Sequence, residues 1–212
     1  DASAQDDDGQ GVRMLTFALA VLFLIITPGP GVLSTAGVGS AYGFRAGLTY
    51  VTGLFIGTNL VALAVISGLA AILLAEPVIR TLLMVASILY LLYLAAKIAL
   101  AGSRIAFIEA RRAPGIGAGI LLQAINPKAY AVNTTLMAGF PYAPENLVFE
   151  TASKLVIMNL IWIPIHLGWL WAGVALHRLN LAERAHRRIN VAMAASMLMV
   201  VMLATLAALR AG

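Results

Sequence analysis

The sequence of 212 residues contains no cysteine and very few charged side chains. Without cysteine it can form neither disulfide bonds nor a thiol redox relay across a membrane. Only 11% of the residues are charged, whereas 61% are apolar, and the mean hydropathy is +0.94. Soluble globular domains do not reach these values. The composition therefore predicts a membrane protein.

The sequence also lacks the motifs that enzymes and ATP-driven pumps need. It has no nucleotide-binding loop, no metal-ligand spacing, and no catalytic arrangement of serine, histidine and acid. The clustered histidine or acidic residues of an intramembrane enzyme are missing as well. We therefore expect no catalytic residue, no metal and no cofactor. The basic cluster at 184–188 indicates membrane topology and not a nucleic-acid partner.

Charged residues are absent from four long segments, at 14–44, 46–75, 155–177 and 189–209. About 20 apolar residues suffice for a helix to cross a bilayer. Two further runs, at 81–96 and 113–127, become long enough if Lys97 and Lys128 are accommodated at the helix ends or in a polar interior. We predict an all-α membrane protein with six transmembrane helices, at roughly 14–38, 45–74, 77–100, 117–139, 150–175 and 190–209.

The polar segment 1–13 has no apolar period, and we expect it to be a disordered tail, a cloning remnant or an upstream extension. Residues 14–212 then form the transmembrane domain. The connections after the first, third and fifth spans carry eight basic residues, and the opposite side carries four. This excess predicts that those connections are cytoplasmic and that both termini lie outside the cytoplasm.

Two proline-containing breaks interrupt the apolar runs, 99 residues apart. The first consists of Thr27, Pro28, Gly29, Pro30 and Gly31, and the second of Asn126, Pro127 and Lys128. A backbone group that proline leaves unpaired is tolerated in hydrocarbon only where protein or a polar cavity meets it. Each break falls in the first span of one half, so we expect two three-helix repeats, at about 14–103 and 114–212, inverted relative to each other. Paired breaks of this kind indicate a transport site.

The residue types at the breaks suit a carboxylate. Asn126 is a good N-cap and Pro127 a good first helical residue, so a half-helix can begin there with its free amides facing the membrane interior. The positive end of such a helix favours an anion, and Lys128 adds a full charge. Thr27 and Pro28 offer the same pattern, with glycines that permit bending and close approach of a ligand. Simple packing kinks, and a Lys128 that extends to the membrane surface, are the alternatives.

Asparagines in other spans extend the candidate site. Asn59 lies 31 residues after Pro28, and Asn159 lies 32 residues after Pro127, so the two occupy corresponding positions in the two halves. Either of them, Asn133, or the carbonyls freed at the breaks could accept hydrogen bonds from a substrate ammonium group. The sequence does not choose among these acceptors.

A proton-driven cycle has few groups to use. No Asp or Glu lies inside a predicted span, since Glu150 is at the outer edge of the fifth. Proton coupling would therefore have to rely on His166, Lys128, Glu150 or the substrate's own groups. His166 is the only histidine in a predicted span and is the candidate proton carrier, with a hydrogen-bonded structural role as the alternative. The lack of carboxylates also argues against transport of a hard metal cation.

The same residues resemble a known family. Four pieces carry the likeness in order: Ile26 with the first break, the glycine series at 43, 47, 53 and 57, the stretch 90–94 (YLLYL) followed by Lys97, and the second break with Ala129. In them the chain resembles the lysine exporter and homoserine/threonine resistance family of bacterial amino-acid exporters, which implies six spans in the inner membrane. It departs from many members at Thr58 and Asn59, where they have an acid, and it lacks their proline–glutamine pair after the second break. The glycines favour a helix seam within the chain, with a homodimer surface as the alternative.

We therefore expect a secondary transporter that exports amino acids or close derivatives from the bacterial cytoplasm by alternating access, driven by the proton motive force. Its expected partners are the amino-acid substrate and the lipid bilayer. The alternatives are a non-transporting membrane assembly subunit and a six-helix exporter of another small solute or cation. The departures from the family pattern leave the particular amino acid and the coupling ion open.

Overall fold

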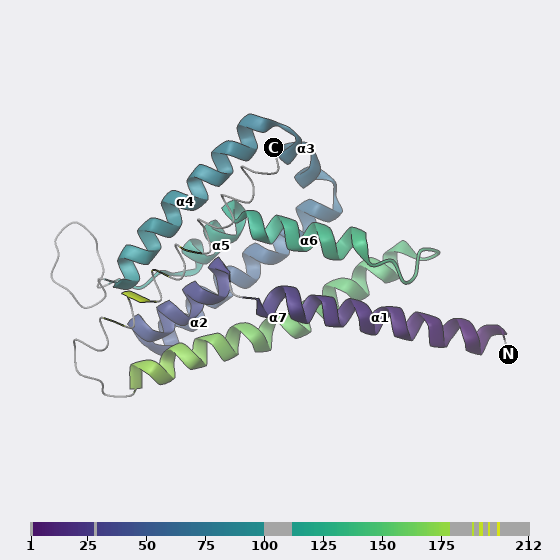
Figure 1. Ribbon diagram of the computed structural model, residues 1–212, viewed down its shortest axis with the longest axis horizontal. Helices are drawn as coiled ribbons and strands as arrows, with labels where there is room; N and C mark the ends of the chain where they lie inside the picture. Colours follow the sequence, from purple (N-terminus) through teal and green to yellow (C-terminus); the bar gives the residue numbers. More distant parts are fainter. Residues whose placement is uncertain are drawn as a thin grey trace.

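The computed structural model describes residues 2–27, 29–99, 112–178 and five positions closer to the C-terminus, and within these residues its regular elements are all helices. Its helices are α1 (Ala2–Ile26), α2 (Pro30–Ile66), α3 (Leu69–Ala75), α4 (Pro77–Ala99), α5 (Ile116–Ile125), α6 (Pro127–Gly139) and α7 (Leu147–Arg178) (Figure 1). In this described part, four helices are long and apolar enough to cross a membrane, namely α1, α2, α4 and α7. The predicted sixth span, 190–209, lies almost wholly outside the described residues.

Both predicted breaks are present as interruptions between helices. Helix α1 ends at Ile26 and α2 begins at Pro30, while α5 ends at Ile125 and α6 begins at Pro127. Asn126 caps α6 as predicted, because its side chain accepts a hydrogen bond of 3.1 Å from the backbone N–H of Lys128. Pro28 lies outside the described residues. The sequence therefore located both points at which the apolar helices stop.

The N-terminal segment differs from the prediction of a disordered tail. Helix α1 begins at Ala2, so it includes residues 2–13 as well as the apolar part of the chain. Extending an existing helix costs much less than nucleating a new one, so a polar segment next to a stable apolar helix can continue it. The predicted boundary at 14 thus separates polar from apolar residues and does not mark the start of the helix.

Helix α2 contains a sharp kink that brings its two arms together. Gly43 has φ 80° and ψ −177°, a left-handed conformation that favours glycine. Across the kink, the hydroxyl of Tyr50 donates a hydrogen bond of 3.0 Å to Ser34. Sixteen residues of straight helix would span about 24 Å, so this bond requires the arms to fold back on each other. The kink falls between the predicted spans 14–38 and 45–74, and a second break at Gly68 separates α3 from α2.

Helix α2 is the centre of the bundle and packs mainly against α5 and α7 (Figure 1). Its contact with α5 is very close, since a Cβ on Gly119 would lie 2.5 Å from the carbonyl oxygen of Tyr50, and a Cβ on Gly53 would overlap the carbonyl of Ile116. Gly57 likewise faces α5, and Gly47 faces α7. Three members of the glycine series, Gly47, Gly53 and Gly57, therefore form a seam within the chain, as the sequence favoured, whereas Gly43 forms the kink. A homodimer would have to use another surface.

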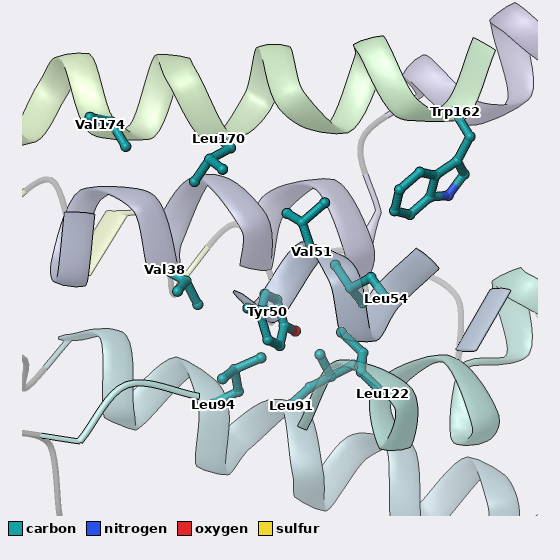
Figure 2. Close-up of a cluster of buried hydrophobic side chains, with 10 residues drawn as sticks. All are labelled: Val38, Tyr50, Val51, Leu54, Leu91, Leu94, Leu122, Trp162, Leu170 and Val174. Atoms are coloured by element: carbon teal, nitrogen blue, oxygen red, sulfur yellow. The ribbon is translucent and has the colours of Figure 1, made fainter. Parts of the chain in front are cut away.

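Two apolar clusters stabilise this arrangement. The larger one joins α2, α4, α5 and α7 and is drawn in Figure 2; it consists of Val38, Tyr50, Val51, Leu54, Leu91, Leu94, Leu122, Trp162, Leu170 and Val174. The smaller one joins α1, α6, α7 and the loop between α6 and α7; it consists of Phe17, Val21, Leu136, Tyr142 and Met158. Met158 and Trp162, one from each cluster and one helical turn apart on α7, also line a cavity.

Candidate functional site

The cavity lies where the two breaks meet α2 and α7, and it has a volume of about 80 Å³. One water molecule needs roughly 10–15 Å³ on this scale, so the space can hold several waters or a small solute. Most of the predicted site residues line it: Thr27, Gly29, Gly31, Asn59, Asn126, Lys128, Asn159 and His166. Pro30 and Pro127 begin helices next to it but are not part of its lining. The structure thus brings residues 139 positions apart in the sequence, from Thr27 to His166, into one site.

Lys128 connects the two breaks directly. Its Nζ atom donates a hydrogen bond of 2.7 Å to the backbone carbonyl of Thr27, one of the groups left free where α1 ends. Gly29 makes this approach possible, because a Cβ there would lie 2.8 Å from Cδ and 2.9 Å from Nζ of Lys128. The lysine side chain therefore lies against the backbone of the first break.

The backbone amides at the start of α6 are less available than the sequence analysis assumed. The side chain of Asn126 accepts from the N–H of Lys128, and its backbone carbonyl accepts a 3.0 Å bond from the N–H of Ala129. The amide nitrogen of the Asn126 side chain donates to Gln123 over 3.3 Å. Since these amides already have partners, the ammonium group of Lys128 is the stronger attraction for an anion here.

Asn59 and Asn159 form a reciprocal pair across α2 and α7. Each side-chain nitrogen donates to the oxygen of the other, with distances of 3.1 Å and 2.9 Å, and Asn59 also donates to the carbonyl of Phe55. The correspondence read from the sequence is thus a direct contact between two residues 100 positions apart. Because both oxygens accept hydrogen bonds inside the pair, the two asparagines join the helices and are less free to bind a substrate.

His166 faces the cavity from α7 and is almost fully buried. Its ring stacks on Trp162, with centroids 3.6 Å apart, and its Nδ1 lies 3.0 Å from the carbonyl oxygen of the same residue. A carbonyl only accepts, so Nδ1 must carry the proton, and in the neutral ring Nε2 then has a free lone pair. Nε2 lies next to Gly31, 3.5 Å from where a Cβ would be. This tautomer leaves Nε2 able to take up a proton.

Most of the remaining wall of the cavity is apolar, with Thr58, Gln123 and Asn133 as its further polar residues. The only full charge among the described lining residues is that of Lys128. The apolar side chains come from α1, α2, α6 and α7 and include Leu24, Ile25, Val32, Val132, Leu155 and Met158. Sequence reasoning missed Gln123 and Trp162, which also line the site. Gln123 lies three positions before Asn126, and residues three apart in a helix lie on nearly the same side. This spacing could have identified Gln123 as a site residue.

A second polar cluster, near the start of α7, was also missed. Lys154 is only 2% exposed and forms a 2.6 Å ion pair with Glu150. The other carboxylate oxygen accepts from the N–H groups of Tyr142 and Ala143, at 3.0 and 2.7 Å. Lys154 also donates to the carbonyl of Met137 over 2.9 Å. Glu150 is therefore not a free group at the outer edge of a span but half of a buried, fully paired unit that ties α7 to α6.

The amino-acid sequence of the chain is similar to those of known proteins. Residues 22–208 match the sequence model of the LysE type translocator family. A segment of 82 residues, 39% of this chain, is 30% identical to a leucine efflux protein of an Enterobacter species (strain 638). A segment of 86 residues is 28% identical to a leucine efflux protein of Klebsiella pneumoniae. These segments cover only 39% and 41% of the two relatives' own length. No solved structure matches the chain.

Proposed function

The chain belongs to the LysE type translocator family, whose members are membrane transporters and not enzymes, and from this premise we propose that it exports amino acids as a secondary transporter. One observation carries the proposal. The ammonium group of Lys128 reaches a cavity between two broken helices, where no described carboxylate pairs with it. A positive charge without a partner acid favours an anionic group, and a substrate carboxylate supplies one.

The walls of the cavity indicate the kind of side chain that the substrate carries. Leucine, isoleucine, valine and methionine side chains line it, and none of the described lining residues is acidic. A lysine or arginine substrate would leave its side-chain cation without a counter-charge, whereas an aliphatic side chain would gain by leaving water. The two similar proteins are named leucine efflux proteins, which agrees with this choice. We propose an uncharged, aliphatic amino acid as the substrate, with L-leucine as the first candidate.

The transport cycle that we propose uses the two halves of the chain as inverted three-helix repeats, with six spans in all. Binding at the paired breaks and rocking of one half against the other would expose the site alternately to each side of the membrane. We place the chain in the bacterial inner membrane with both termini outside the cytoplasm, and the excess of basic residues in the odd-numbered connections supports this orientation. His166 would carry the coupled proton, because Nε2 has a free lone pair facing the site.

Efflux of labelled L-leucine from proteoliposomes tests this function. Vesicles loaded with the amino acid and containing the purified chain should release it faster than protein-free vesicles, and an opposing proton gradient should change the rate. A panel that includes lysine, arginine, threonine and homoserine measures the selectivity, and lysine should be a poor substrate. Protein-containing vesicles that release every amino acid no faster than empty ones would refute export.

Coupling is tested separately with His166→Gln. This variant should still bind leucine but should lose the response of efflux to the proton gradient, because glutamine cannot change its charge. Trp162→Phe, which retains an aromatic partner for the ring, serves as the matched control. If His166→Gln responds to the gradient as the unmodified protein does, His166 is not the proton carrier.

A further inference from the structure

Asn133 is a buried polar residue that none of the contacts described so far explains. It lies on α6, lines the cavity and is only 2% exposed. Its Oδ1 atom is buried and has no hydrogen-bond partner among the described residues. Leaving such a group unpaired costs about 1–3 kcal/mol, so an unpaired acceptor in the wall of a cavity indicates a hydrogen-bond donor on a solute that the cavity binds.

The orientation of the Asn133 amide is determined by its other half. The nitrogen donates a 2.8 Å hydrogen bond to the backbone carbonyl of Ala129. A flipped amide would place two acceptors face to face, since a carbonyl cannot donate. The unpaired atom must therefore be the oxygen, and its partner must be a donor such as N–H or O–H.

The other candidate acceptors are already in use. Asn59 and Asn159 accept from each other, and the carbonyl of Thr27 accepts from Lys128. Among the asparagines that the sequence offers for an ammonium group, the structure thus leaves one oxygen open, that of Asn133.

The position of Asn133 relative to Lys128 suits a zwitterion. Both residues are on α6 and both line the cavity. The carboxylate and ammonium groups of an α-amino acid are attached to one carbon, so a single solute in this cavity can offer its carboxylate to Lys128 and its ammonium to the Oδ1 of Asn133.

We propose that Asn133 is the residue that recognises the ammonium group of the substrate, while Lys128 holds the carboxylate. This rests on the proposed amino-acid export and adds a selection rule to it. Solutes that carry both groups on one carbon bind, and solutes that lack the ammonium group bind weakly. Apolar carboxylic acids of the same size would also fit the walls of the cavity. Asn133 then makes the site selective for amino acids over these carboxylic acids.

Binding of three related compounds to the purified full-length chain tests the proposal. L-Leucine carries both groups, 4-methylpentanoate lacks the ammonium, and 3-methylbutylamine lacks the carboxylate. Isothermal titration should show roughly 10- to 100-fold weaker binding of 4-methylpentanoate than of leucine, the range expected for one hydrogen bond to a charged group. In Asn133→Leu, which keeps the side-chain volume but has no acceptor, this difference should shrink to a few-fold. Asn133→Asp keeps an acceptor and should preserve the discrimination, and Thr134→Val, on the exposed side of α6, is the matched control.

Each result bears on the proposal. If the unmodified protein binds leucine and 4-methylpentanoate equally, the ammonium is not recognised, and this holds even if the variants do not fold. If Asn133→Leu binds leucine and discriminates as the unmodified protein does, a bound water satisfies Oδ1 and the role of Asn133 is refuted while export stands. If the unmodified protein binds none of the amino acids in the panel, the proposed function fails and the inference fails with it.

Discussion

Of the three lysines in the described helices, Lys128 and Lys154 have opposite surroundings. Lys154 is almost fully buried, with a carboxylate 2.6 Å from its Nζ, a backbone carbonyl at 2.9 Å, and the rings of Phe17 and Tyr142 at 5.7 and 5.6 Å. Lys128 is half-buried, and the hydrogen bond of its Nζ is to a carbonyl, with no described acid paired to it. The first charge is compensated by the protein itself, whereas the second is available to a ligand.

The asparagines of the bundle repeat this contrast. Asn59 and Asn159 satisfy each other across α2 and α7, whereas Asn133 keeps an unpaired oxygen next to the cavity. Polar groups that join helices thus have their partners inside the chain, and polar groups that could bind a solute lack one. A buried polar residue in a membrane protein is therefore better classified by its missing partners than by its type.

The largest expected effect is on stability and comes from Lys154. Lys154→Met should lower the free energy of unfolding by about 3–5 kcal/mol, because it leaves the carboxylate of Glu150 buried without its cation. Thermal unfolding of the purified variant in detergent measures this. The double variant Glu150→Gln, Lys154→Met removes both charges and should recover part of the loss. An unchanged midpoint in Lys154→Met would erase the distinction between the two lysines.

The next effect is on binding and comes from Lys128. Lys128→Gln should weaken L-leucine binding by roughly 10- to 100-fold, the value of a charge-assisted hydrogen bond of about 1.5–3 kcal/mol. Its thermal midpoint should remain equal to or above that of the unmodified protein, since the change removes an uncompensated charge. Lys128→Arg, which keeps the charge, is the control and should retain most of the affinity. Leucine affinity that survives in Lys128→Gln would contradict the carboxylate role.

The asparagine pair should show a smaller, non-additive effect on stability. Asn59→Leu alone leaves the amide of Asn159 without its partner and should cost about 1–3 kcal/mol. The double variant Asn59→Leu, Asn159→Leu removes both amides and should be more stable than the sum of the single variants predicts. A double-mutant cycle on thermal unfolding measures the coupling. Strict additivity would mean that the pair does not act as a joint between α2 and α7.

The smallest effect sharpens the account of Lys128. Gly29→Ala would place a methyl group against the Cδ and Nζ of the lysine, and these are flexible atoms that can move aside. We expect leucine affinity to change by no more than a few-fold, with no loss of stability. Gly119→Ala is the contrast, because there the methyl meets backbone and cannot be accommodated without separating α2 from α5. Equal destabilisation by the two changes would show that the first break is packed as rigidly as the helix seam.

Local sequence rules predicted the breaks and most of the polar residues that line the cavity. The second break consists of an N-cap asparagine, a proline at the first helical position and a lysine, which are adjacent in the sequence. Helix α6 begins where these residues predict. The correspondence of Asn59 and Asn159 was also visible, because the two residues follow Pro28 and Pro127 at nearly equal offsets. What the offsets could not show was that the two side chains bond to each other.

The parts that sequence reasoning missed depend on how segments fold over one another. Glu150 and Lys154 have the i, i+4 spacing of an ordinary surface pair, and only the loop around Tyr142 buries them. The free oxygen of Asn133 follows from a side-chain rotation that no spacing encodes. The start of α1 at Ala2 was missed because the composition of a segment indicates only whether it can be buried in the membrane. It does not show whether a polar segment continues the helix of its apolar neighbour.

The hydrogen bond from Lys128 to the carbonyl of Thr27 has a consequence for affinity. A solute that binds the ammonium group of Lys128 must displace the carbonyl of Thr27. The backbone of the first break therefore competes with the solute for the lysine. The measured dissociation constant is then the intrinsic one divided by the fraction of molecules in which the lysine is free. A chain in which the carbonyl of residue 27 is turned away should bind its substrate more tightly and release it more slowly. For the export that we propose, which ends in release of the substrate, this internal competition is an advantage.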